Sequence, residues 1–188
     1  VGVVTLAGYE TVNITSTDSD ADAANVNTIT LTAAAAKTVT VAGDTGLNVT
    51  ATSSTAVTSF DASGVVLAKV TYTGVTYDSL NATVGENVTI KGSNGVDVLT
   101  GDAASHDTII AGSGADTVVY NGGSDVFTLG AGADTVDVNA DGTATVHLTV
   151  KDLAVGDKVD VVGVADATNA IADGAIGAIT ALGAGATL

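Results

Sequence analysis

The sequence contains no cysteine, methionine, proline, tryptophan or arginine, and its only strongly basic side chains are five lysines. Without cysteine, the chain has neither disulfide bonds nor thiolate metal sites. The formal net charge of −16 excludes a nucleic-acid-binding role, because such a role needs clustered lysine and arginine to neutralise phosphates. No apolar run approaches the roughly 18 residues that a membrane-spanning helix requires.

The acidic residues are strongly biased towards aspartate: of 21, only Glu10 and Glu86 are glutamates. Aspartate favours turns, and its short carboxylate is a frequent calcium ligand. The apolar residues are mostly small and alternate with threonine, which is typical of β-strands. Composition therefore indicates an all-β protein whose turns are rich in carboxylates.

A nine-residue repeat occupies residues 92–137. Its aspartates follow one another at intervals of ten, nine, nine and nine residues, and a large apolar residue stands two positions after each of them. Glycine-rich turns precede most of these aspartates. The spacing matches the G-G-x-G-x-D-x-U-x pattern of calcium-binding parallel β-rolls, where U is a large apolar residue. The aspartates are Asp97, Asp107, Asp116, Asp125 and Asp134, and the apolar residues are Leu99, Ile109, Val118, Phe127 and Val136.

The chemistry of calcium explains this spacing. Calcium takes about six to eight oxygen ligands from carboxylates and backbone carbonyls, and glycine lets a turn fold its carbonyls inward. If two nonapeptides complete one turn of the coil, Asp97, Asp116 and Asp134 stack on one side and Asp107 and Asp125 on the other. Each stacked pair then encloses one ion, which predicts about three ions in the roll. The further ligands that we predict in these turns are Gly92, Asn94, Gly95, Gly112, Gly114, Gly122, Gly123, Gly130 and Gly132.

Two features leave the calcium prediction open to alternatives. A metal-free solenoid with its aspartates in solvated turns would have the same repeat. The repeat at residues 101–110 has lost the glycines after Gly101 and has gained a residue, so its ion is the least secure.

Residues 1–91 carry a looser repeat of short alternating segments, including residues 56–60 and 65–72, which we predict as strands. The step of eight to ten residues between Leu31, Val41, Val49 and Val57 matches the later repeats and favours a β-solenoid-like or stacked-strand region. A β-sandwich, whose strands recur at a similar spacing, is the alternative. We divide the chain into this region, a calcium roll at residues 92–142, and capping strands with a tail at residues 143–188, including a strand at residues 144–150.

Acidic residues outside the roll are further candidates. Asp18, Asp20 and Asp22 form a D-x-D-x-D run like the first half of an EF-hand loop, although the later glycine and glutamate of that loop are absent. A calcium site completed from another strand and a solvated acidic turn both fit this run. The acidic segment between Asp152 and Asp160 fits either a polar hairpin or a capping site that closes the last turn of the solenoid.

No residue pattern predicts an enzyme. The only histidines are His106 and His147. Ser105, His106 and Asp107 are the residue types of a catalytic triad, but neighbours in an extended segment point to opposite faces and cannot line up. We therefore expect a binding or structural protein.

Three stretches carry a resemblance to a known family: LAGYETVNIT at residues 6–15, AVTSFDASGV at residues 56–65, and the roll followed by AVGDKVDVVGV at residues 154–164. In this order they resemble the C-terminal part of RTX-type surface-layer proteins of Gram-negative bacteria. The resemblance implies extracellular export by type I secretion, and calcium-dependent assembly with copies of itself into a two-dimensional lattice on the cell surface. It also implies that Asp152 can bind calcium and that cell attachment lies in a region outside this sequence. The same repeats serve as folding modules of secreted adhesins and hydrolases, which is the alternative function.

Overall fold

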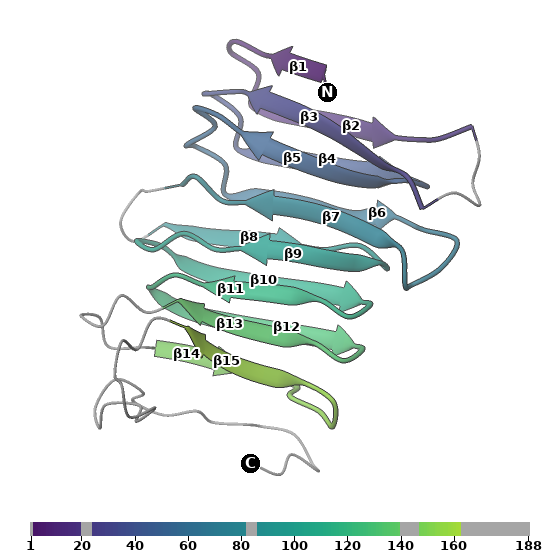
Figure 1. Ribbon diagram of the computed structural model, residues 1–188. Helices are drawn as coiled ribbons and strands as arrows, with labels where there is room; N and C mark the ends of the chain where they lie inside the picture. Colours follow the sequence, from purple (N-terminus) through teal and green to yellow (C-terminus); the bar gives the residue numbers. More distant parts are fainter. Residues whose placement is uncertain (1, 20–23, 82–85, 140–146, 163–188) are drawn as a thin grey trace.

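The structure, a computed structural model, describes residues 2–19, 24–81, 86–139 and 147–162. These residues form fifteen strands and no helix. The odd-numbered strands form one eight-stranded sheet, here sheet A, and the even-numbered strands form a seven-stranded sheet, here sheet B. Figure 1 shows the chain winding from one sheet to the other and back, from β1 at one end to β14 and β15 at the other.

All strand pairs among the described residues are parallel, which confirms the predicted β-solenoid and excludes an antiparallel sandwich. Sheet A consists of β1 (Gly2–Thr5), β3 (Val26–Thr32), β5 (Gly46–Ala51), β7 (Thr73–Asp78), β9 (Val96–Thr100), β11 (Thr117–Tyr120), β13 (Thr135–Asn139) and β15 (Lys158–Val162). Sheet B consists of β2 (Thr11–Ser16), β4 (Thr38–Gly43), β6 (Ser59–Val65), β8 (Asn87–Lys91), β10 (His106–Ser113), β12 (Ser124–Ala131) and β14 (His147–Val150). Both sheets continue from the loosely repeating region into the nonapeptide region.

The core lies between the two sheets. From β2 to β13 the alternation of residues along the strands places one set inside, and residues such as Leu99, Ile109, Val118 and Phe127 are fully buried there. The large apolar residue of each nonapeptide thus packs where the repeat predicts.

The two largest rings of the first half of the core lie against each other. The rings of Phe60 and Tyr77 stack with their centroids 3.8 Å apart and an interplanar angle of 7°. Both side chains are buried, so this stack fills the core just before the nonapeptide region begins.

One predicted strand is wrong and another is shifted. Residues 65–72 alternate like a strand, but β6 ends at Val65 and the following residues form the turn to β7, where Val66 and Val70 are 62% and 50% exposed. Only Leu67 of this turn is buried, and the N–H of Tyr72 closes it on the carbonyl of Lys69. The strand predicted at residues 56–60 is shifted to Ser59–Val65. Of the strand predicted at residues 144–150, residues 147–150 form β14, and residues 144–146 lie outside the described residues. The tail after residue 162 lies outside the described residues.

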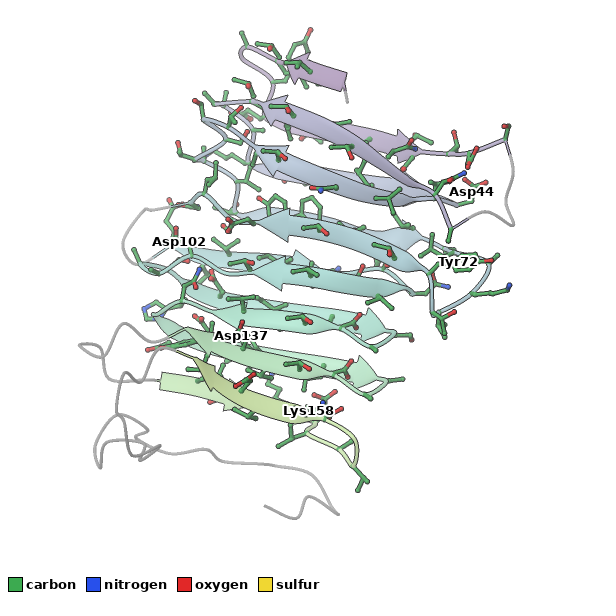
Figure 2. All side chains as sticks on the ribbon, in the orientation of Figure 1. Asp44, Tyr72, Asp102, Asp137 and Lys158 are labelled. Atoms are coloured by element: carbon green, nitrogen blue, oxygen red, sulfur yellow. The ribbon has the colours of Figure 1, made fainter. Side chains whose placement is uncertain are left out.

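The turns alternate between two edges of the solenoid. Edge 1 holds the turns from sheet B to sheet A, including those that end at Asp97, Asp116 and Asp134. Edge 2 holds the turns from sheet A to sheet B, including those that end at Asp107 and Asp125. In Figure 2, Asp44 and Tyr72 mark edge 1 and Asp102 marks edge 2.

Candidate metal centre

Three buried aspartates form a column along edge 1. The N–H of Asp97 donates to Oδ1 of Asp116 at 2.8 Å, and the N–H of Asp116 donates to Oδ1 of Asp134 at 2.8 Å. All three side chains are at most 1% exposed. The column follows directly from the parallel register, since Thr117 pairs with both Val98 and Thr135. The structure therefore brings together the three aspartates that the nonapeptide spacing places on one side.

Edge 2 holds the second predicted pair. The N–H of Asp107 donates to Oδ1 of Asp125 at 2.9 Å, and both side chains are at most 1% exposed. The irregular repeat at residues 101–110 thus still delivers its aspartate to the column. The hydroxyl of Ser105 donates to Asp107 at 2.6 Å within this turn.

The aspartates at the start of each column are fully hydrogen-bonded. Asp97 accepts from the N–H of Val75 and from both the N–H and the hydroxyl of Ser93. Asp107 accepts from the hydroxyl of Ser105 and the N–H of Asp102.

The later aspartates of the columns, in contrast, are not fully hydrogen-bonded. Among the residues that the structure describes, none donates to Oδ2 of Asp116, Asp125 or Asp134, and these oxygens are buried. A buried carboxylate oxygen without a partner is costly, and a cation offsets that cost. The pairs Asp97–Asp116 and Asp107–Asp125 each contain one such oxygen, and the pair Asp116–Asp134 contains two.

The columns hold their carboxyl groups at unusual pKa values. Burial raises the pKa of Asp97 to about 6. Burial, together with the charges of Asp97 and Asp134, raises the pKa of Asp116 to about 7. Burial, together with the charges of Asp107 and Asp102, raises the pKa of Asp125 to about 8. Burial also raises the pKa of Asp107 and Asp134, so the columns favour either protons or cations at these sites.

The glycines let consecutive turns approach closely. A Cβ atom on Gly130, whose φ is +97°, would lie 1.9 Å from the carbonyl oxygen of Gly112. A Cβ atom on Gly132 would lie 1.6 Å from the carbonyl oxygen of Gly114, and one on Gly123 would lie 2.0 Å from that of Ser105. Backbone carbonyls therefore lie between stacked turns where no side chain fits. The other predicted glycines, Gly92, Gly95 and Gly122, lie in the same turns and would also bring a Cβ within 3.0 Å of another group.

Two further aspartates extend edge 1, and sequence reasoning missed the place of one of them. The N–H of Asp134 donates to Oδ1 of Asp157 at 3.0 Å, so Asp157 is the fourth member of the column. Asp152, predicted as a ligand from the resemblance, accepts from the N–H groups of Leu129 and Gly130 at 2.7 and 2.9 Å. Because Asp157 lies 23 residues after Asp134, the nine-residue spacing of the repeats does not predict it as a member of the column. The apolar alternation of β15, which aligns Lys158 with Thr135, is the sequence feature that could have predicted the position of Asp157.

Two other predicted sets of calcium ligands are Asn94 and the acidic run from Asp18 to Asp22. The side-chain carbonyl of Asn94 accepts from the N–H of Leu67, and its side-chain amide donates to the carbonyl of Leu67, so both polar groups of this side chain have protein partners. Asp18 accepts from the amide of Asn25, and its N–H donates to Oδ1 of Asp44 at 3.2 Å. Asp20 and Asp22 lie outside the described residues.

The donor set fits calcium held largely by backbone oxygens. In residues 2–19, 24–81, 86–139 and 147–162, no three carboxylate or imidazole groups converge on one point. A site at a stacked pair would thus combine an unpartnered aspartate oxygen with the carbonyls of the glycine turns. Oxygen-only sites of this kind suit a hard cation such as calcium.

Comparison with known families agrees with this chemistry. The RTX calcium-binding nonapeptide repeat matches four times, at residues 85–105, 92–127, 103–136 and 121–141. The chain carries RTX calcium-binding repeats. These RTX repeats cover β8 to β13 and all five buried nonapeptide aspartates of the two columns. No curated protein matches the chain. Within the described part of the chain, no helix has the length and hydropathy that a membrane crossing requires.

Proposed function

We propose that this chain is the calcium-dependent folding region of a non-enzymatic structural protein in a bacterial surface layer. The observation that carries the calcium part is the set of unpartnered, buried oxygens on Asp116, Asp125 and Asp134. The surface-layer part is supported by the resemblance of residues 6–15, 56–65 and 154–164 to RTX-type surface-layer proteins.

Calcium supplies the driving force for folding in this proposal. At a formal net charge of −16, the compact chain repels itself, and each calcium ion that enters a column brings two positive charges. Ions that bind only the folded state stabilise it by about 2.7 kcal/mol per site at a hundred times the dissociation constant. About three ions in the columns would therefore contribute several kcal/mol, with Asp152 and Asp157 as candidates for a further site.

The same property couples folding to export. Extracellular calcium modules have dissociation constants of roughly 10⁻⁴–10⁻³ M, far above cytosolic calcium. The repeats would then stay unfolded inside the cell, where a type I secretion channel needs an extended chain, and would fold outside.

Electron microscopy of the natural full-length protein in calcium tests the structural role. A surface-layer protein forms a periodic sheet with millimolar calcium and disperses when a chelator is added. Dispersed single particles at high protein and calcium concentrations would instead favour the alternative, a folding module of an adhesin or hydrolase.

A further inference from the structure

The irregular turn at residues 101–107 contains an acidic residue, Asp102, for which the nonapeptide pattern has no place. The N–H of Asp102 donates to Oδ2 of Asp107 at 2.6 Å. In the first turn of the RTX repeats, the N–H of Ser93 donates to Oδ2 of Asp97 at 2.7 Å. Asp102 therefore occupies the position in its turn that Ser93 occupies in the first turn, and it brings a carboxylate to that position.

The carboxylate of Asp102 is only partly used by its own turn. Its Oδ1 accepts from the N–H of Ala104 at 2.7 Å, and no residue that the structure describes donates to its Oδ2. The hydroxyl of Ser105 already binds Asp107, so the side chain of Asp102 is not needed for that contact. The half-buried side chain of Asp102 thus has one oxygen left for a cation.

Asp102 lies beside the gap between its own turn and the next turn of edge 2, and Figure 2 shows it on this edge. The side-chain amide of Asn121 donates across the gap to the carbonyl of Gly101 at 3.3 Å. A Cβ atom on Gly122 would lie 2.9 Å from the carbonyl oxygen of Ala103. The residues on both sides of Asp102 in the chain therefore approach the next turn closely.

The carboxylate of Asp125 reaches into the same gap, because its Oδ1 accepts from the N–H of Asp107. Its Oδ2 is buried without a donor among the described residues, whereas both oxygens of Asp107 accept hydrogen bonds. Burial, followed by the charges of Asp107 and Asp102, raises the pKa of Asp125 to about 8, so Asp102 is close enough to act on it. Two carboxylates and the nearby carbonyls of Ala103 and Ser105 form an oxygen set that suits calcium.

We propose that Asp102 is a calcium ligand that holds the edge 2 ion together with Asp125. The inference rests on the calcium part of the proposed function, because it adds a residue to one of those sites. A carboxylate thus replaces the glycine carbonyls that the irregular turn has lost. Since the charge of the ligands tunes the affinity of a calcium site, the irregular repeat keeps its ion.

Asp102→Asn tests the ligand by calorimetric titration with calcium. Asparagine keeps the oxygen that accepts from Ala104 but removes the charge, so one ion should bind at least about tenfold more weakly or be lost from the titration. Asp78→Asn is the matched control, because Asp78 pairs in register with Thr100, two residues before Asp102, and is exposed at the end of β7. It removes the same charge nearby and should change the affinity less than about threefold, because water and salt screen an exposed charge.

Hydrogen exchange in excess calcium shows which edge is affected. The amide of Asp107 donates to Asp125 on edge 2, and the amide of Asp116 donates to Asp134 on edge 1. Asp102→Asn should reduce the protection of the Asp107 amide at least about fivefold more than that of the Asp116 amide, because only the edge 2 site has lost a ligand.

The controls separate this inference from the proposed function. Circular dichroism in excess calcium shows whether a variant folds, and Asp102→Ser, which copies Ser93, serves the same test if Asp102→Asn does not fold. Equal calcium affinities of Asp102→Asn and Asp78→Asn, or equal losses of protection at the two amides, would overturn the ligand and leave calcium-dependent folding intact. A wild-type chain that binds no calcium would overturn both.

Discussion

The N–H of Asp97 donates to the carboxylate of Asp116, which lies 19 residues later in the chain and one turn further along the solenoid. The second oxygen of that carboxylate is buried and has no donor among the described residues. This relationship recurs between Asp116 and Asp134 and between Asp107 and Asp125. Each of these hydrogen bonds links a backbone N–H of one turn to the carboxylate that would bind calcium in the next turn.

Asp116→Asn should lower the calcium stoichiometry in calorimetric titration by at least one ion. Asparagine keeps the Oδ1 that accepts from Asp97, so the substitution removes charge while it preserves the hydrogen bond. Asp116 also belongs to two stacked pairs, which makes it the most sensitive position. Asp44→Asn, in a half-buried turn residue of edge 1 outside the RTX repeats, is the control and should leave the stoichiometry unchanged. Equal losses in the two variants would count against the ligand assignment.

Gly130→Ala should destabilise the RTX repeats by more than about 1–3 kcal/mol, the usual cost of a strained backbone conformation. Gly130 has a φ of +97°, and its new Cβ would overlap the carbonyl oxygen of Gly112. Urea unfolding in saturating calcium measures the change. Gly2→Ala, where the space around the Cβ is open, should shift the midpoint little. A Gly130→Ala variant as stable as wild type would show that the turns are not closely stacked.

The column residues could be predicted from sequence because each nonapeptide aspartate keeps its spacing. A difference of 18 or 19 residues between stacked aspartates is one full turn of the coil. Asp157 escaped the same reasoning because a longer path of 23 residues leads to it from Asp134. The segment at residues 65–72 was mispredicted because alternation alone does not show whether an apolar residue has a core to enter. Leu67 packs near Gly95, whereas Val66 and Val70 are left at the surface.

Removing the hydroxyl of Tyr77 and removing that of Tyr120 should change the free energy of unfolding in opposite directions. The hydroxyl of Tyr77 is buried without a hydrogen-bond partner among the described residues, so Tyr77→Phe should stabilise the fold by about 1 kcal/mol. The hydroxyl of Tyr120 donates to the carbonyl of Gly123 at 3.0 Å, so Tyr120→Phe should destabilise by about 1 kcal/mol. Chemical unfolding in calcium measures both. Destabilisation by Tyr77→Phe equal to that of Tyr120→Phe would show that the Tyr77 hydroxyl has a partner.

The pH dependence of stability should reverse when calcium is removed. In the calcium-free folded state, burial raises the pKa of Asp97, Asp116 and Asp125 to about 6, 7 and 8. The folded state then binds more protons than the unfolded state between about pH 4 and pH 8, so stability in chelator falls as the pH rises through that window. In calcium the sites need ionised carboxylates, and stability should fall as the pH is lowered.

Circular dichroism at several pH values measures the folded fraction in chelator, which should rise as the pH is lowered, and unfolding midpoints in calcium measure the opposite slope. Stabilisation by rising pH in both solutions would mean that the column carboxylates are not the groups that titrate. Asp125→Asn should flatten both slopes, because Asp125 has the highest of the three values.

The two parts of the solenoid, before and within the RTX repeats, should differ in whether they need calcium to fold. In register, the positions before Asp97 and Asp107 are held by Val75 and Val88, both fully buried, so the two aspartate columns of the RTX repeats begin at Asp97 and Asp107. Limited proteolysis in chelator should therefore cut between residues 92 and 139 before it cuts between residues 26 and 65. Simultaneous cleavage throughout would show that the two parts unfold as one unit.

Hydrogen exchange of the backbone amides as a function of calcium concentration tests the central claim most directly. The amides of Asp97, Asp107 and Asp116 donate to stacked carboxylates, so their protection reports the columns themselves. We predict fast exchange of these amides in chelator and cooperative protection with a midpoint at roughly 0.1–1 mM calcium, with magnesium a poor substitute. Equal protection of these three amides in chelator and in calcium would contradict calcium-dependent folding of the RTX repeats.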